Sequence, residues 1–139
     1  MKYLVIGLGN FGSTLAEELT RRGNDVIGTD IKEQRVEDIK ERISVAYIMD
    51  ATDNAALQSL PLGDIDAVIV AIGHSMSASL RTVAALKKLQ VKSIFVRAID
   101  SVHLSILNAM NINQIFIPES YAARIFADKI QKGGALDMT

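Results

Sequence analysis

Three glycines and one aspartate have the types and spacing needed to hold the phosphates and the sugar of a nucleotide. The glycines form the pattern Gly7-x-Gly9-x-x-Gly12, directly after a short apolar run over residues 3–6. Gly7 permits a tight turn, Gly9 lets a phosphate approach the backbone, and Gly12 lets a following helix lie close to the strand. The N–H groups in the first turn of that helix would then face the phosphate.

Asp30 supplies the acid that such a glycine pattern requires about 20 residues further on. It ends a second apolar run over residues 26–29, and its carboxylate can accept hydrogen bonds from both hydroxyls of an adenosine ribose. The same charge repels a 2′-phosphate, which disfavours NADP. Asp is also a preferred N-cap, so Asp30 could cap a helix over residues 32–42, and the two roles are compatible.

Composition predicts one soluble, intracellular domain. The chain has 139 residues, of which 49% are apolar, enough for one aliphatic core. Its net charge of −1 comes from interspersed acids and bases, so neither nucleic acid nor an anionic membrane is an expected partner. The absence of cysteine excludes disulfides and thiolate metal sites. No signal peptide or membrane insertion is expected, because Met1 leads into the first strand and the apolar runs are short.

Strands and helices are expected to alternate along the chain. We expect strands over residues 3–6, 25–30, 45–49, 67–71, 93–97 and 114–117, and helices from Phe11, over 32–42, over 54–60, from Ser75 or Ser77 to 89, over 101–110 and over 120–131. Gly133 and Gly134 are expected to end the last helix, followed by a frayed tail over residues 135–139. Right-handed helical crossovers then predict an α/β fold, a Rossmann-like doubly wound six-stranded parallel sheet of order 3-2-1-4-5-6.

Ligands of such a sheet bind over the carboxyl ends of its strands, where the strand order reverses. Asp50 ends the third strand, so it either contacts an adenine or, with Thr52, caps the short helix that follows. Gly73 either lets the backbone approach the ligand or only turns the chain. Arg97 either holds a phosphate or pairs with Asp100.

The two histidines of the chain are expected near the same edge. His74 follows Gly73 and is either solvated or in contact with the ligand, whereas His103 opens the helix after the fifth strand on the ligand side. Without cysteine or a helical histidine pair, they do not form a zinc site.

These motifs, in this order, resemble the N-terminal lobe of a regulator-of-potassium-conductance domain (RCK or KTN domain, also called a TrkA N-terminal domain) of Trk/Ktr-type potassium uptake systems. The shared motifs are Gly-Leu-Gly-x-Phe-Gly at 7–12, Asp-Ala-Thr at 50–52, Val-Ala-Ile-Gly at 70–73 and Ile-Pro-Glu at 117–119. The match runs from Lys2 to about Gln131, nearly the whole chain.

The resemblance implies that the lobe binds an adenine nucleotide, NAD(H) or ATP, ADP or AMP, and performs no chemistry on it. The implied nucleotide-binding residues are Gly7, Leu8, Gly9, Asn10, Phe11 and Gly12 at the phosphates, Asp30, Ile31 and Lys32 around the ribose, Asp50, Ala51 and Thr52 at the adenine, and Ala71, Ile72, Gly73, His74, Arg97 and His103 at further nucleotide-facing positions.

The resemblance also implies partners. Residues 1–117 would form the nucleotide-binding lobe, and residues 118–139 a crossover helix with its tail, which packs on a second protomer. Homodimers would assemble into a larger ring under a membrane-embedded potassium transporter or channel subunit, so the protein would lie in the cytoplasm at the inner face of the membrane. Some members place a divalent metal between subunits through the Glu that matches Glu119. The apolar face of the last helix (Tyr121, Ile125, Phe126 and Ile130) could instead pack on its own sheet.

Two residues depart from the family pattern. Asn10 stands where ATP-responsive members often have Arg, which makes NAD, ADP or AMP as credible as ATP, and Met49 stands where Gly commonly precedes Asp-Ala-Thr. The C-terminal effector lobe usual in the family is not in the sequence, so we expect either a truncated chain or a stand-alone lobe.

The alternative is a fragment of an NAD-dependent oxidoreductase. Hydride transfer requires a proton donor beside the nicotinamide, yet none of Tyr3, Tyr47 and Tyr121 is followed four residues on by Lys. A module of another transporter or a redox-sensing repressor is a third possibility, but a repressor would usually carry a basic DNA-binding helix. We therefore expect a sensor and not an enzyme.

Overall fold

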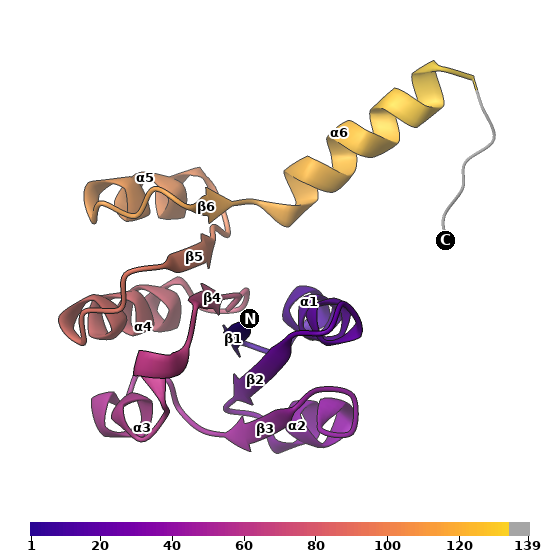
Figure 1. Cartoon of the computed structure of the whole chain (residues 1–139). Coiled ribbons are helices and arrows are strands. Elements are labelled where there is room, and N and C mark those ends of the chain that lie inside the picture. Colours follow the sequence, from indigo (N-terminus) through magenta and orange to yellow (C-terminus); the bar gives the residue numbers. More distant parts are fainter. Residues whose placement is uncertain (134–139) are drawn as a thin grey trace.

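In the described part of the chain, six parallel strands form a single sheet in the order β3-β2-β1-β4-β5-β6, seen in Figure 1. The structure is a computed structural model that describes residues 1–133. The strands are β1 (Lys2–Ile6), β2 (Asp25–Asp30), β3 (Val45–Ile48), β4 (Ala67–Val70), β5 (Ile94–Arg97) and β6 (Ile115–Phe116). The predicted fold class and strand order are confirmed.

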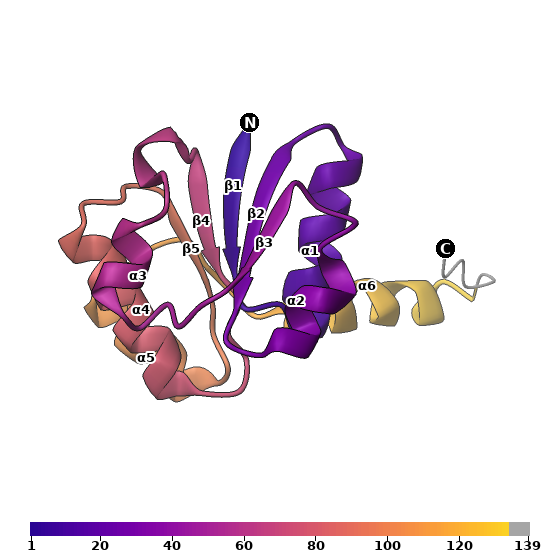
Figure 2. The same ribbon diagram turned by 90° about the horizontal axis from the view of Figure 1, so that it is seen from below.

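Helices cover both faces of the sheet. They are α1 (Asn10–Arg21), α2 (Glu33–Ile39), α3 (Asn54–Gln58), α4 (Met76–Lys88), α5 (Ser101–Ala109) and α6 (Pro118–Gln131), with a 3₁₀ turn over Leu62–Asp64. Figures 1 and 2 show α1 and α2 on one face, and α3, α4 and α5 on the other. Of the helices in residues 1–133, α6 alone extends away from the sheet.

The core has two halves because strand side chains alternate between the faces. Leu4 and Val68 belong to the half under α3, α4 and α5, whereas Val5 and Ile69, one residue further along, belong to the half under α1 and α2. All of β4 is buried, as expected for a central strand.

Several helix boundaries differ from the prediction. Helix α2 ends at Ile39, because the chain must turn there to bring Ile43 into the core under Gly28. Ser75, and not Ser77, caps α4 by accepting a hydrogen bond from the backbone N–H of Ala78. Such differences of a few residues reflect how the ends pack and not the existence of the elements.

Helix α6 begins at Pro118, a residue suited to the first helical position. All of its residues after Ser120 are exposed, including Tyr121, Ile125, Phe126 and Ile130. The interpretation that this face packs on its own sheet is therefore wrong. Gly134 and the expected tail over residues 135–139 lie outside the described residues. In residues 1–133 no helix is long and apolar enough to span a bilayer.

Candidate functional site

The turn between β1 and α1 is built from glycines because no side chain fits there. Gly7 has a φ of +97°, and a Cβ on it would lie 2.9 Å from the backbone nitrogen of Ile72. A Cβ on Gly12 would overlap the carbonyl oxygen of Gly7. Gly9 is the N-cap of α1 and provides no side-chain cap, so the first N–H groups of α1 are left for another acceptor.

Asp30 ties this glycine turn to the beginning of α2. Asp30 is only 5% exposed. Its carboxylate accepts hydrogen bonds from the backbone N–H of Leu8 at 2.7 Å and from the backbone N–H of Lys32 at 2.8 Å. Arg35 lies on α2 with its guanidinium 3.6 Å from the same carboxylate. Asp30 does not cap α2, because the N-cap residue is Lys32. A buried anion is thus held beside the turn by donors from two loops.

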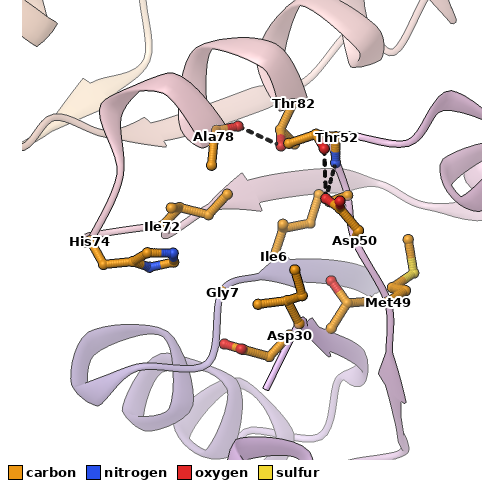
Figure 3. A pocket seen from close by; sticks show the side chains of 13 residues that line it. Ile6, Gly7, Asp30, Met49, Asp50, Thr52, Ile72, His74, Ala78 and Thr82 are labelled. Carbon is orange, nitrogen blue, oxygen red and sulfur yellow. Dashed lines mark hydrogen bonds between the residues drawn. The ribbon is translucent and has the colours of Figure 1, made fainter. Parts of the chain in front are cut away.

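A first cavity opens over the carboxyl ends of β1, β2 and β3. Figure 3 shows Asp30 and Met49 on one side of it, Ala78 and Thr82 of α4 on the other, and Asp50 between them next to Thr52. Its lining comprises Ile6, Gly7, Thr29, Asp30, Ile31, Met49, Asp50, Ala51, Thr52, Ile72, His74, Ala78 and Thr82. The cavity holds about 70 Å³, and its aliphatic walls with a few polar groups have the chemical character that suits a base and its sugar.

Asp50 lies at the rim of this first cavity with a preference for its charged form. Its carboxylate accepts hydrogen bonds from the hydroxyl of Thr52 at 2.6 Å and from the backbone N–H of Thr52 at 2.9 Å. These bonds lower the pKa of Asp50, and burial opposes them only weakly. The alternative in which Asp50 and Thr52 cap α3 is wrong, because Asp53 does so by accepting from the backbone N–H of Ala55.

A second cavity of about 350 Å³ continues from the first along the glycine turn. It is lined by Gly7, Gly9, Asn10, Phe11, Arg35, Ala71, Ile72, Gly73, His74, Arg97 and Glu119. Gly7, Ile72 and His74 line both cavities, so the two form one trough. Two guanidinium groups and the N-terminal end of α1 meet in its second half, which makes that half attractive to phosphates.

Arg97 points from the end of β5 into the second cavity. Its Nη2 donates to Glu119 of α6 at 2.5 Å, and its Nη1 lies next to Gly73, where a Cβ would be 2.9 Å away. The alternative in which Arg97 pairs with Asp100 is wrong, because the carboxylate of Asp100 instead caps α5 at the backbone N–H of His103. Gly73 therefore makes room for a side chain as well as turning the chain.

His103 lies behind the site and is fully buried. Its Nδ1 accepts from the backbone N–H of Ile99 at 2.9 Å, which leaves Nε2 to donate to the hydroxyl of Ser79 at 3.2 Å. Burial lowers the pKa of His103, with a weaker opposing effect from Asp100. His103 is thus a neutral side chain that joins α5 to α4.

Most of the predicted site residues line the trough. Those that do are Gly7, Gly9, Asn10, Phe11, Asp30, Ile31, Asp50, Ala51, Thr52, Ala71, Ile72, Gly73, His74, Arg97 and Glu119. Leu8, Gly12, Lys32 and His103 line neither half. The backbone N–H groups of Leu8 and Lys32 act through Asp30, and Gly12 acts through the close approach of α1 to the turn.

Sequence reasoning missed Arg35, Thr29, Ala78 and Thr82. Arg35 is five residues past Asp30, so a helix begun just after Asp30 carries it back over the glycine turn. The five-residue spacing from Asp30 could therefore have identified Arg35 as a site residue from the sequence. In the described part of the chain, no cluster of three or more His, Cys, Asp or Glu side chains could hold a metal, and Glu119 is paired with Arg97.

This chain is similar to a known protein family and to individual proteins over most of its length. The TrkA-N domain family model matches residues 3–118. Ktr system potassium uptake protein C of Bacillus subtilis is 37% identical over 136 residues, which are 98% of this chain and 62% of that protein. The chain thus spans less than two thirds of the length of this relative.

Two solved structures are also similar. The NAD(P)-binding domain of an exopolyphosphatase-related protein from Archaeoglobus fulgidus superposes with a TM-score of 0.80 at 27% identity, covering 94% of this chain and 97% of that one. The GsuK channel bound to NAD has a TM-score of 0.72 at 18% identity, over 84% of this chain and 21% of that one, a likeness of fold alone.

Proposed function

The chain belongs to the TrkA-N domain family, and on that premise we propose that it is a nucleotide-sensing regulator of a membrane potassium uptake system. The observation that carries the proposal is the continuous trough, with a buried carboxylate in one half and two guanidinium groups in the other. That division of charge suits an adenosine joined to phosphates. The name of the Bacillus relative supports the link to potassium uptake.

The ligand is an adenine nucleotide: NAD(H), ATP, ADP or AMP. The adenine lies in the first cavity between Ile31 and the segment from Asp50 to Thr52. The ribose hydroxyls donate to Asp30, whose buried charge repels a 2′-phosphate and so disfavours NADP. The phosphates lie over the glycine turn in the second cavity. Asn10 is neutral there, so Arg35 and Arg97 provide the positive charge that faces them.

The nucleotide is sensed and not consumed. A regulator needs a ligand that binds one of its conformations more tightly than another, and the charged half of the trough supplies such a difference, because it ends at Glu119 on α6. Ligands with different phosphate charge then favour different positions of α6. Residues 1–117 act as the nucleotide-binding lobe, and α6 acts as the crossover helix that transmits the change.

A second copy of the chain is the partner of α6. Ile125 and Ile130 are each 59% exposed, which leaves an apolar helix face without cover. Beside α1, the sheet also has an open apolar groove, lined by Tyr3, Phe11, Leu15, Leu19, Ala67, Ile69, Phe95 and Phe116. The two surfaces are complementary in character, so α6 of each protomer covers the groove of the other. Dimers joined into a ring then meet the potassium-transporting subunit at the cytoplasmic face of the membrane.

A divalent metal at Glu119 is compatible with this arrangement only with further ligands. The described residues assemble no metal cluster, so a bound nucleotide or the partner protomer would have to complete the coordination.

A thermal-shift screen of ATP, ADP, AMP, NAD, NADH and NADP tests the nucleotide part of the proposal. A ligand at 100 times its Kd stabilises the folded state by about 2.7 kcal/mol, so at least one of the first five should raise the melting temperature, and NADP should raise it least. If none of the six binds, the proposed function is wrong.

Reconstitution tests the regulatory part. The protein and its membrane potassium-transport subunit are placed in proteoliposomes, and potassium flux is measured with and without the nucleotide selected by the screen. A flux that depends on the nucleotide only when this protein is present supports the proposal. Flux that ignores the protein contradicts it.

A further inference from the structure

The ion pair between Arg97 and Glu119 lies at the phosphate end of the trough. Arg97 Nη2 and Glu119 Oε2 are 2.5 Å apart, and the two side chains are 20% and 66% exposed. Arg97 belongs to β5 and Glu119 to the first turn of α6. The pair therefore joins the floor of the trough to the helix that leaves the domain.

The guanidinium of Arg97 has capacity beyond this pair. An arginine carries five N–H donors, and the buried Nε of Arg97 has no hydrogen-bond partner in the described residues. The same side chain lines the second cavity together with Gly7 and Gly9. A phosphate placed over the glycine turn would thus meet a guanidinium whose Nη2 donor is already occupied by Glu119.

Glu119 is the one carboxylate that lines this second cavity in the part of the chain that the structure describes. Its charge opposes an arriving phosphate twice: it repels the phosphate directly, and it occupies the Arg97 donor that the phosphate would use. Both effects grow with each negative charge that the ligand brings close to this end.

We propose that Glu119 determines specificity for phosphate number, because it competes with the phosphates of the ligand for Arg97. This inference rests on the proposed nucleotide binding and adds the residue that tunes it. Ligands with one phosphate leave the Arg97–Glu119 pair intact. Ligands with two or three phosphates take Arg97 and release Glu119, and the first turn of α6 loses that tie to the sheet.

The test is calorimetric titration with AMP, ADP and ATP in EDTA, so that no divalent metal takes part. Glu119→Gln keeps the size of the side chain and removes its charge. We expect Glu119→Gln to increase the affinity for ADP and ATP by about threefold to tenfold and to change the affinity for AMP by less than twofold. The matched control is Asp128→Asn, which removes an exposed carboxylate of α6 that does not line the cavity, and it should change none of the three affinities.

Arg97→Gln completes a double-mutant cycle. Alone, Arg97→Gln should weaken the binding of ADP and ATP. Combined with Glu119→Gln, it should cancel the increase in affinity that Glu119→Gln gives on its own. Hydrogen exchange in the first turn of α6 should rise when ATP binds the wild type, and should be independent of ATP in Glu119→Gln.

The opposite results separate this inference from the alternatives. If Glu119 only served as a metal ligand, Glu119→Gln would weaken ATP in Mg²⁺ and leave it unchanged in EDTA, which would overturn the inference. An equal increase in the affinities for AMP, ADP and ATP would also overturn it, since Glu119 would then not discriminate between ligands by their number of phosphates. If the wild type bound none of the three, this inference would fail, and the proposed function would fail with it only if NAD and NADH also did not bind.

Discussion

Replacing Asp30 by Asn isolates the role of a single buried charge. The carboxylate now accepts two backbone hydrogen bonds, from Leu8 and Lys32. An amide can accept only one of them and presents an N–H₂ group to the other donor. The loss of one charge-assisted hydrogen bond in a buried place costs about 1.5–3 kcal/mol. For a domain of this size that corresponds to a melting temperature lower by roughly 5–12 °C.

The same substitution removes the charged acceptor for the ribose. Losing about 1.5–3 kcal/mol of ligand hydrogen bonding weakens binding by roughly 10-fold to 150-fold. The penalty against a 2′-phosphate disappears with the charge, so the affinity ratio of NAD to NADP should also shrink. Thermal denaturation measures the first effect and calorimetry the second. The matched control is Asp64→Asn, an exposed acid that lines neither cavity.

The two effects can be told apart. Titration is done at a temperature where the variant is fully folded by circular dichroism, so that lost affinity does not reflect lost protein. If folded Asp30→Asn binds NAD, ADP or AMP within twofold of the wild type, the assignment of Asp30 to the ribose is refuted. If its melting temperature is unchanged, the tie between the glycine turn and α2 contributes nothing.

Three further predictions concern other parts of the molecule. Gly12→Ala should destabilise the fold by roughly 1–3 kcal/mol or more, measured by urea unfolding, because the new Cβ overlaps the carbonyl oxygen of Gly7. Burial lowers the pKa of His103, so the contribution of its neutral form to stability is complete above pH 6.5 and is lost as the pH falls below that value. The free energy of unfolding should therefore fall between pH 7.5 and 5.5 in the wild type. This pH dependence should be weaker in His103→Gln and should persist in the control His74→Gln, which changes an exposed histidine. Ile125→Asp should shift the protein from dimer to monomer by native mass spectrometry while the circular dichroism of the folded protein stays unchanged, since Ile125 is 59% exposed within one chain. A wild type that is already monomeric at micromolar concentration would contradict the dimer.

Local features of the chain were sufficient to predict the fold and to place the glycine turn, Asp30 and Asp50 at one edge of the sheet. Gly7 and Gly12 are required by backbone geometry at a single turn, and their need is visible in the spacing itself. Asp30 and Asp50 were placed at strand ends by counting along apolar runs, and parallel strands bring all such ends to one edge. The family membership suggested by the motifs is confirmed by the TrkA-N match.

Contacts between elements could not be predicted in this way. A pair with the nearby Asp100 was one of two alternatives open for Arg97, but the structure pairs Arg97 with Glu119, 22 positions away. Likewise, His103 was expected to face the ligand, yet the rotation of α5 about its axis turns it into the core against Ser79. The spacing of residues along a chain does not determine how a helix is rotated about its axis or in which direction a long side chain points.

The chain by itself therefore determined the order of strands and helices, the glycine turn and the acid that accompanies it, because each depends on residues close together or on a strict period. Only the tertiary structure decided which charges share the trough, with Arg35 beside Asp30 and Arg97 bound to Glu119. The physical reason is that side-chain partners are selected by the packing of whole elements, in which a small rotation moves a charged group from one neighbour to another.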